Sequence, residues 1–309
     1  MTAVQVLLAT YNGERFLRAQ LDSIFAQTQV DVSVLARDDG STDATLAILT
    51  EYAARYPQRL LVLERTARLG AMGSFFALMA AATGQYVAFA DQDDIWLDNK
   101  LQTLAARLRS AEAEAGILTP LLVHCDLQVV DSDLNVIAPS FWNYAGLQPA
   151  RHRLQQLLFQ NTVTGCAVLC NRALIRAALP GHPKAMMHDH WLALHASAYG
   201  KIIPESAALV RYRQHGSNTL GATRGVGLRQ LISDALGRLT EARDWQLLLR
   251  QPEAFLDSNN GRLPAATQQM LSDLLAVPRQ GGFRRRWLLI KWGFGPADML
   301  RRIWFWLKA

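Results

Sequence analysis

The sequence predicts an α/β fold with a mainly parallel central sheet and a helical C-terminal extension. Over the first 130 residues, short apolar runs alternate with longer stretches of helical periodicity, a pattern typical of strand–helix–strand units. Polar and acidic clusters follow three of these apolar runs, as expected where ligands gather at the carboxyl ends of parallel strands. From about residue 225 to residue 278 the pattern is mostly helical.

Apolar runs bounded by turn residues predict the strands. In chain order these are residues 4–9, 32–36, 60–63, 86–90 and 121–130, with a short last strand at 208–212. Helical spacing of apolar residues predicts the helices. In chain order they begin at about residue 14 and after residue 43, and then cover residues 155–159 and 188–199, with an extended segment at 162–169. Gly200 stands in the position of a helix stop.

Composition argues against several classes of protein. A chain of 309 residues, half of them hydrophobic, can bury a large core, so we expect a folded domain. Its three cysteines form neither a disulfide framework nor the paired spacing of a zinc site, which favours a reducing compartment. The N-terminal residues lack the pattern of a secretion signal, so we expect a cytoplasmic protein. No GxGxxG fingerprint is present, which argues against a nicotinamide-dependent oxidoreductase.

The first chemical signal follows the first two predicted strands. Thr10, Tyr11 and Asn12 end the first, and the run Arg37-Asp38-Asp39-Gly40-Ser41-Thr42-Asp43 ends the second. Carboxylates there can accept hydrogen bonds from a nucleobase and from ribose hydroxyls, and the glycine allows close backbone approach. The alternative is a turn followed by a helix N-cap, which the same residue types suit. From these residues alone, the turn is the favoured interpretation.

The second signal is the run Asp91-Gln92-Asp93-Asp94 after the fourth predicted strand. Three carboxylates in four residues repel one another unless a cation is present. Mg²⁺ or Mn²⁺, each of which prefers oxygen ligands and bridges diphosphate oxygens, would relieve this repulsion. The alternative is a solvated loop in which Asp94 or Asp98 caps the next helix. For Asp91 and Asp93 together, we favour the metal interpretation.

Together these motifs resemble those of the inverting glycosyltransferases of the GT-A fold, in the large second sequence family of such enzymes. The similarity continues through the run Met187-His188-Asp189-His190-Trp191 and the run from Tyr212 to Asn218, which look most like the bacterial rhamnosyltransferase branch. It covers roughly the first 220 residues. The implied fold is a Rossmann-like nucleotide-diphospho-sugar transferase fold.

The resemblance also implies a role for each site residue. The implied nucleotide-sugar-binding residues are Thr10, Tyr11, Asn12, Asp38, Asp39, Arg68, Asp91 and Gln92. Asp93 and His215 are the implied metal ligands, with diphosphate binding as the alternative for His215. Asp189 is the implied general base of a single in-line displacement, and His190 and Trp191 are implied to line the acceptor site. Without the resemblance, Asp189 would be a helix N-cap, His188 and His190 surface residues, and Trp191 a core residue.

The function implied is transfer of a sugar, with rhamnose from dTDP-rhamnose favoured, to a hydroxyl of a cell-surface polysaccharide or lipid-linked glycan intermediate. The alternatives are a UDP-sugar-dependent transferase of the same family and a catalytically inactive membrane-associated scaffold. An inactive scaffold would tolerate the loss of Asp93 or Asp189, and both are present. The enzyme is therefore the favoured interpretation.

The domain organisation expected is a transferase domain at residues 1–220, with a nucleotide-sugar half at 1–130 and an acceptor half at 131–220. A helical extension at 221–282 and a basic, aromatic tail at 283–309 follow. The tail carries seven cations and one anion, so the net charge of +6 is concentrated there and the other 282 residues are neutral overall. We therefore expect no nucleic-acid partner, because a nucleic-acid-binding core needs a basic face spread over the fold.

The tail also holds four of the eight tryptophans, and Gly293, Gly295 and Pro296 interrupt it. It is therefore too short to span a bilayer as one helix. We expect two amphipathic pieces that lie on an anionic membrane surface, at the cytoplasmic face of the inner membrane. The alternative is a pair of helices packed on the domain or on a second copy of the chain in a homodimer.

Overall fold

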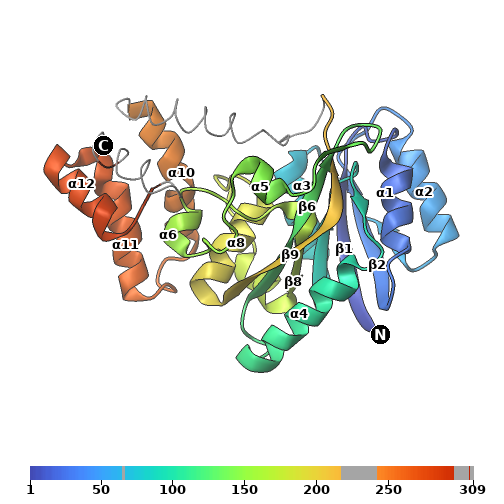
Figure 1. Ribbon diagram of the computed structural model, residues 1–309, viewed down its shortest axis with the longest axis horizontal. Helices are drawn as coiled ribbons and strands as arrows, with labels where there is room; N and C mark the ends of the chain where they lie inside the picture. Colours follow the sequence, from blue (N-terminus) through green and yellow to red (C-terminus); the bar gives the residue numbers. More distant parts are fainter. Residues whose placement is uncertain (65–66, 217–241, 296–305, 307–309) are drawn as a thin grey trace.

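A nine-stranded mixed sheet forms the centre of the computed structural model, which describes residues 1–64, 67–216, 242–295 and 306 (Figure 1). The strand order is β3-β2-β1-β4-β8-β6-β9-β5, with β7 paired to β6. Helices cover both faces of this sheet. The α/β fold class expected from the sequence is therefore confirmed.

The first half of the sheet is parallel. Its strands are β1 (Thr2–Thr10), β2 (Val30–Asp38), β3 (Leu60–Val62) and β4 (Tyr86–Ala90). Such strands are apolar on both faces because helices cover both sides of the sheet. Thr10 pairs with Asp38 in the register of β1 and β2, so the polar residues that follow these strands meet at one edge of the sheet.

The second half of the sheet mixes strand directions, which the alternation of runs along the chain did not reveal. β8 (Val168–Asn171) is antiparallel to both β4 and β6 (Leu121–Val130). β9 (Lys201–Arg213) is parallel to β6 along the whole of that strand, and is therefore longer than the predicted strand at 208–212. The two short strands are β5 (Ile95–Trp96), paired to β9, and β7 (Val136–Ala138), paired to β6.

Two hydrophobic layers flank the sheet. The helices of one layer are α1 (Leu17–Phe25), α2 (Thr45–Arg55) and α4 (Lys100–Ala115). The helices of the other are α3 (Gly70–Ala81), α6 (Leu154–Leu157), α7 (Arg172–Ala178) and α8 (His188–Tyr199), and α5 (Phe141–Ala145) packs on β6. In α1, Leu17, Leu21 and Ile24 recur every three or four residues, and all three are buried. The sequence did not predict α3, because its Gly, Ala, Met and Phe residues leave no polar face that would mark a helical period.

Three C-terminal helices extend the second layer: α10 (Ala242–Ser258), α11 (Ala265–Ala276) and α12 (Gly282–Lys291). The ring of Phe255 on α10 lies edge-on to Trp191 of α8, with 5.8 Å between the ring centroids. These helices lie at the opposite end of the molecule from α1 and α2 (Figure 1). Residues 217–241, which include part of the predicted helical stretch, lie outside the described residues. None of the described helices is long and apolar enough to cross a membrane.

Candidate active site at the strand ends

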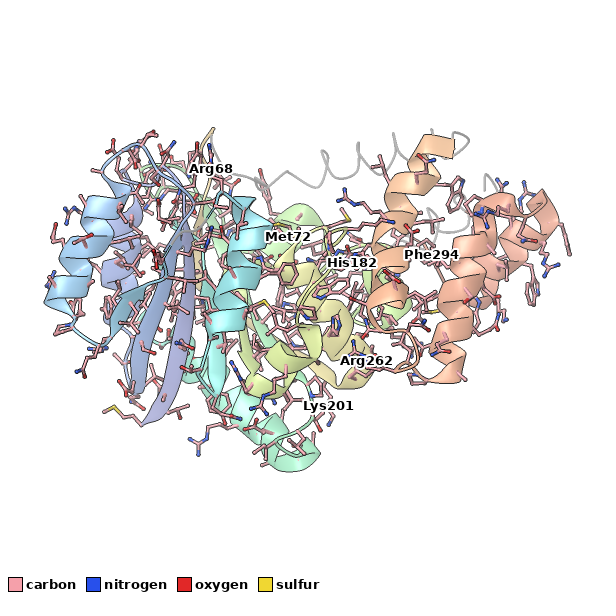
Figure 2. All side chains as sticks on the ribbon, turned by 180° about the vertical axis from the view of Figure 1, so that it is seen from behind. Arg68, Met72, His182, Lys201, Arg262 and Phe294 are labelled. Atoms are coloured by element: carbon pink, nitrogen blue, oxygen red, sulfur yellow. The ribbon has the colours of Figure 1, made fainter. Side chains whose placement is uncertain are left out.

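A pocket of about 300 Å³ opens at the carboxyl ends of β1, β2 and β4, and we call it the strand-end pocket. Its polar lining includes eight residues singled out from the sequence: Thr10, Tyr11, Asp39, Arg68, Asp91, Gln92, Asp93 and Asp189. These come from the ends of three strands, from the segment before α3 and from the first turn of α8. Arg68 lies at this edge of the sheet, and Met72 of α3 lies below it in Figure 2. The fold therefore brings residues from both predicted halves of the transferase domain to one pocket.

Tyr11 and Gln92 join the ends of β1 and β4. The backbone N–H of Tyr11 donates to Gln92 Oε1 at 2.8 Å, and Gln92 Nε2 donates to the Tyr11 carbonyl at 3.0 Å. Gly13 leaves room for this amide, because a Cβ at that position would lie 2.3 Å from Gln92 Oε1. The Arg68 guanidinium lies 4.5 Å from the centroid of the Tyr11 ring, which is partly exposed. Tyr11 and Arg68 therefore present an aromatic face and a cation to the pocket.

Asp38 and Asp39 have different surroundings. The Asp38 carboxylate accepts hydrogen bonds from the Thr10 hydroxyl and from the N–H groups of Gly40 and Ser41, so it does not line the pocket and builds the turn after β2. This matches the turn interpretation. Asn12 also holds this loop, since its side-chain oxygen accepts from the N–H of Thr42. In this structure Asp38 and Asn12 make loop-forming contacts, and their nucleotide contacts stay a prediction.

Asp39 lines the pocket and also fixes the start of α3. Its two carboxylate oxygens accept from the N–H groups of Leu69 and Gly70 at 2.7 and 2.8 Å, and Arg37 donates to it at 2.7 Å. Burial alone would raise the pKa of Asp39, but these hydrogen bonds and the Arg37 charge outweigh it and lower the pKa below its usual value. Asp39 therefore remains an anion whose remaining acceptor capacity faces the pocket.

Asp91 and Asp93 form an acidic group on the floor of the pocket. Burial, together with the charges of Asp93 and Asp189, raises the pKa of Asp91 to about 7, while the charge of Lys100 opposes the rise. Asp93 Oδ2 lies 2.8 Å from His215 Nε2, a contact between residues 122 positions apart. An oxygen-ligand cation would stabilise the ionised form of this cluster, so the residues present fit Mg²⁺ or Mn²⁺.

Asp94 connects this loop to the end of β9. Its Oδ1 accepts from the N–H of Arg213 at 3.1 Å, and Arg213 Nε in turn donates to the carbonyl of Asp93 at 2.8 Å. The ring of His215 stacks on Phe16 at 4.8 Å between centroids. These contacts hold the chain that carries His215 against Asp93. Asp94 is no helix cap, because Asn99 precedes α4 and no side-chain hydrogen bond caps that helix.

A second acidic group lies deeper, where one ligand atom each from Asp91, Asp94 and Cys166 lie within 4.8 Å of one another. This group suits Mg²⁺ or Mn²⁺ poorly, because burial raises the pKa of the Cys166 thiol well above its usual value and hard cations prefer oxygen. A protein side chain, Lys100, already supplies a positive charge to this group. The fully buried Lys100 donates to the Cys166 carbonyl at 2.6 Å, and its charge opposes the rise in the pKa values of Asp91 and Cys166. The metal therefore fits better beside Asp93 and His215.

Asp189 lies across the pocket, in the first turn of α8. Its Oδ2 accepts from the backbone N–H of Gly165 at 3.1 Å, and its Oδ1 accepts from the N–H of His190 at 2.6 Å. Burial raises the pKa of Asp189 to about 6, although these two hydrogen bonds oppose the rise. Met187, and not Asp189, occupies the N-cap position of the helix. Asp189 is therefore a carboxylate at neutral pH with increased affinity for a proton.

His190 and Trp191 do not reach the pocket. Trp191 has no exposed surface, donates from Nε1 to the carbonyl of Ala178 at 2.9 Å and packs against His195. His190 is buried, with Nε2 at 2.8 Å from the carbonyl of Leu157. The prediction that these two side chains line an acceptor site is therefore wrong. Each residue of a helix turns by about 100°, so the residues that follow Asp189 point into the core.

Several lining residues were not predicted as site residues. Ser74 and Phe75 come from α3, Tyr212 comes from β9, and Gly165 and His188 flank Asp189. His188 is buried, not surface-exposed, and its ring stacks on Phe75 with 3.8 Å between centroids. A glycine inside an extended apolar run often marks a close backbone approach, so the Thr-Gly-Cys sequence at 164–166 carried a signal for Gly165. No comparable local signal marks Ser74 or Tyr212.

Comparison with known proteins agrees with this geometry. The family model described as glycosyl transferase family 2 matches residues 5–177. A glycosyltransferase of Nostoc sp. is 35% identical over 222 residues, which cover 70% of this chain and 66% of that protein. The dTDP-rhamnosyl transferase RfbG of Shigella flexneri is 39% identical over 99 residues, or 31% of this chain and 34% of RfbG. The Escherichia coli UDP-Glc:alpha-D-GlcNAc-diphosphoundecaprenol beta-1,3-glucosyltransferase WfgD is 32% identical over 99 residues, or 32% of this chain and 38% of WfgD.

Solved structures share the fold. Residues 1–349 of Staphylococcus aureus TarS, in complex with UDP-GlcNAc, superpose with a TM-score of 0.57 at 17% identity, covering 94% of this chain and 80% of that chain. The mannosyltransferase PcManGT of Pyrobaculum calidifontis, in complex with GDP-Man and Mn²⁺, superposes with a TM-score of 0.53 at 18% identity, covering 94% of this chain and 72% of that chain.

Proposed function

Because the chain belongs to glycosyl transferase family 2, we propose that it transfers rhamnose from dTDP-rhamnose to a hydroxyl group of a lipid-linked or cell-surface glycan. That it is a glycosyltransferase with a nucleotide-sugar donor follows from the family. The observation that carries the proposal is the strand-end pocket, where the half-buried Asp189 faces the acidic group of Asp91 and Asp93. One base and one cation-binding group are what an in-line displacement with inversion requires.

The nucleotide end of the donor occupies the side of the pocket formed by Tyr11, Asp39 and Arg68. The Asp39 carboxylate is held as an anion by Arg37 and by two backbone N–H groups, so it can accept hydrogen bonds from ribose hydroxyls or from a base N–H. The exposed ring of Tyr11 offers a face to the base, and the Arg68 guanidinium above it offers positive charge to the phosphates.

Asp93 and His215 would hold a divalent cation, Mg²⁺ or Mn²⁺, and when bound the cation would neutralise charge on the leaving diphosphate. The 2.8 Å contact between their side chains supports this assignment, as does the anchoring of the loop by Asp94 and Arg213. Asp91 adds a carboxylate toward the ribose or the donor sugar. Gln92 supports the site indirectly, because the oxygen and the nitrogen of its side-chain amide both hydrogen-bond to the backbone of Tyr11.

Asp189 takes the proton from the attacking hydroxyl group. Its carboxylate has a pKa of about 6, so it is ionised at neutral pH and yet has a higher proton affinity than an exposed aspartate. The N–H of Gly165 orients one of its oxygens. His190 and Trp191 have no part in acceptor binding in this proposal. The residues beside the base that line the pocket are Thr164, Gly165, Met187 and His188.

The sugar is assigned from the match to RfbG, which extends over 99 residues. A UDP-sugar donor is the second candidate, because WfgD matches over a segment of the same length. The acceptor class leads us to propose that the enzyme works on the cytoplasmic face of the inner membrane, attached to it peripherally.

A donor panel tests this proposal. Purified full-length protein is heated with Mn²⁺ and dTDP-rhamnose, UDP-glucose or UDP-GlcNAc, and we expect dTDP-rhamnose to raise the melting temperature most. Acceptor-dependent release of dTDP is then measured with a glycan diphosphate lipid. Stabilisation and turnover with UDP-glucose alone would establish the second candidate. Absence of turnover with any donor, together with normal donor binding, would favour the inactive scaffold.

A further inference from the structure

Helix α12 has two faces with different environments. On the inner face, Leu288 and Leu289 are buried, and Trp292 just after the helix donates from Nε1 to Asp273 of α11 at 2.9 Å. The segment that follows is also anchored, because Phe294 is 1% exposed. The inner face of α12 therefore packs on the rest of the protein, as in the alternative of helices packed on the domain.

The outer face carries an exposed apolar stripe. Phe283 is 89% exposed, and Trp287 and Ile290 are each 51% exposed. The three residues are spaced by four and three positions, so they lie in one row along the helix. Large apolar side chains scattered singly on a surface are ordinary, but a row of three with two aromatic rings on a ten-residue helix is an interaction surface.

Cations border this stripe on both sides. At about 100° per residue, Arg286 lies on one side of the row, and Arg284 and Lys291 lie on the other. Lys291 also pairs with Asp273 at 3.2 Å, whereas Arg284 and Arg286 make no ion pair among the described residues. No acidic residue occurs in α12. The outer face is therefore an apolar row between unneutralised arginines.

We propose that this outer face of α12 docks on an anionic lipid surface, with Phe283, Trp287 and Ile290 at the acyl boundary and the flanking cations at the headgroups. Aromatic side chains and arginines favour that boundary, and a helix of about 15 Å can only lie in its plane. The inference rests on the proposed function in one respect: that function identifies the membrane as the inner membrane, approached from its cytoplasmic face. The surface itself is distinct from the strand-end pocket and lies at the far end of the molecule from α1 and α2 (Figure 1).

A second copy of the chain fits this face poorly. A symmetric dimer through α12 would bring the cations of one copy against a patch of the other that carries no acidic residue, because a twofold interface joins identical patches. Like charges at such short range oppose association. An anionic headgroup layer complements the same arrangement, so charge complementarity selects the lipid surface.

Vesicle sedimentation with the full-length protein tests the proposal. Two variants address the stripe and its border: F283S/W287S/I290S and R284E/R286E. Matched controls change exposed residues elsewhere by the same chemistry: L46S/I117S/L118S and R55E/R109E. Vesicles contain either phosphatidylcholine alone or phosphatidylcholine with phosphatidylglycerol.

We expect wild type and controls to pellet with anionic vesicles and not with neutral ones, and both α12 variants to lose binding about tenfold. Binding of the wild type should weaken with added salt. Equal pelleting of wild type and α12 variants would overturn the proposal. So would a wild-type dimer in light scattering that becomes a monomer in the stripe variant, because the face would then join two copies.

Donor turnover measured with a water-soluble acceptor separates this proposal from the proposed function. The α12 variants should retain that turnover, because none of the changed residues lines the strand-end pocket. Loss of vesicle binding with normal soluble turnover supports the docking surface. Normal vesicle binding by a wild-type protein that turns over no nucleotide sugar would contradict the proposed function alone.

Discussion

Burial changes the acid–base chemistry of the side chain that we propose as the general base. Nothing in the sequence distinguishes Asp189 from other aspartates, but its partial removal from water in the first turn of α8 raises its pKa to about 6. A residue with this pKa is mostly ionised at pH 7 and still holds a proton more firmly than a solvated carboxylate does. The same burial lowers the pKa of the neighbouring His188 to about 3, so that the imidazole beside the base stays neutral.

Replacement of the base tests this role. The Asp189→Asn variant should bind the donor almost normally and lose about 10²- to 10⁴-fold in kcat, because it cannot accept the proton. In the wild type, kcat should rise with pH through about 6, since only the carboxylate form above its pKa acts as a base. Initial rates and donor titrations from pH 5 to 8 check both points. A collapse of donor affinity with a normal rate per bound donor would contradict the assignment.

The metal assignment has a readout that does not depend on activity. Mn²⁺ should raise the melting temperature of the wild type, and more at pH 8 than at pH 5.5, because a proton taken up by Asp91 removes negative charge beside the metal. Asp93→Asn should abolish this stabilisation. Exposed Asp98, close by in sequence, provides the control Asp98→Asn. An unchanged Mn²⁺ effect in Asp93→Asn would place the metal elsewhere.

The N–H of Gly165 donates to the proposed base Asp189, and a methyl group at residue 165 should disturb that carboxylate. A Cβ there would lie 2.8 Å from Nε2 of His188 and 3.6 Å from Cβ of Asp189, so the first turn of α8 must shift. Gly165→Ala should lower kcat about tenfold while donor binding remains. Gly282→Ala is the matched control, because no atom lies within 4 Å of its added Cβ. Wild-type rates in Gly165→Ala would show that the contact is harmless.

At the scale of elements, β9 and the loop after β4 act as one unit. Asp94 accepts from the N–H of Arg213, and Arg213 donates to the carbonyl of Asp93, so the strand end that leads to His215 is fixed to the loop that carries the proposed metal ligand Asp93. The two segments meet because β5, which follows the loop, pairs with β9. This pairing converts two distant sequence motifs into one site.

This coupling can be broken with a graded pair of variants. Asp94→Ala removes the acceptor for the Arg213 N–H and should weaken Mn²⁺ binding about 10- to 100-fold, as expected for loss of a residue that supports a metal ligand. Asp94→Asn keeps an acceptor oxygen and should bind Mn²⁺ more tightly than Asp94→Ala. Calorimetric titration measures both. Equal Mn²⁺ affinity in Asp94→Ala and in the wild type would contradict the idea that Asp94 supports the metal site.

At the scale of the whole molecule, the C-terminal helices belong to the same hydrophobic core as α3 and α8. That core includes Phe255 of α10, Leu271 of α11 and Leu289 of α12. Continuity of this kind means that the C-terminal helices stabilise the layer that holds Asp189. The outer face of α12 remains on the surface, where it forms the docking face proposed above.

Removal of the tail should therefore destabilise the protein. Truncation before Phe283 exposes the pockets that Leu288, Leu289 and Phe294 fill, and each such side chain contributes about 1.5 to 3 kcal/mol. We expect the truncated chain to lose about 4.5 to 9 kcal/mol of unfolding free energy. Denaturant titrations measure it. An unchanged midpoint would show that the tail adds nothing to the core, and for this reason point variants suit the vesicle test better than truncation.

Much of the fold and the identities of many site residues were available from the sequence. The strands at 86–90 and 121–130 and the helix at 188–199 were located to the residue, because apolar runs and helical spacing are local properties. Motif spacing indicated Asp39, Asp91, Asp93 and Asp189, all of which line the pocket. The α3 helix was missed because an apolar helix without a polar face has no detectable period.

The tertiary structure alone decided which of these residues face the pocket. Asp38 and Asp39 are neighbours, yet one builds a turn and the other lines the pocket, because successive side chains near a strand end point in opposite directions. Asp189 and Trp191 share a helix turn, yet one reaches the pocket and the other fills the core. Sequence determined the periods of the elements, whereas burial and the meeting of distant segments depend on contacts that close only when the whole sheet is assembled.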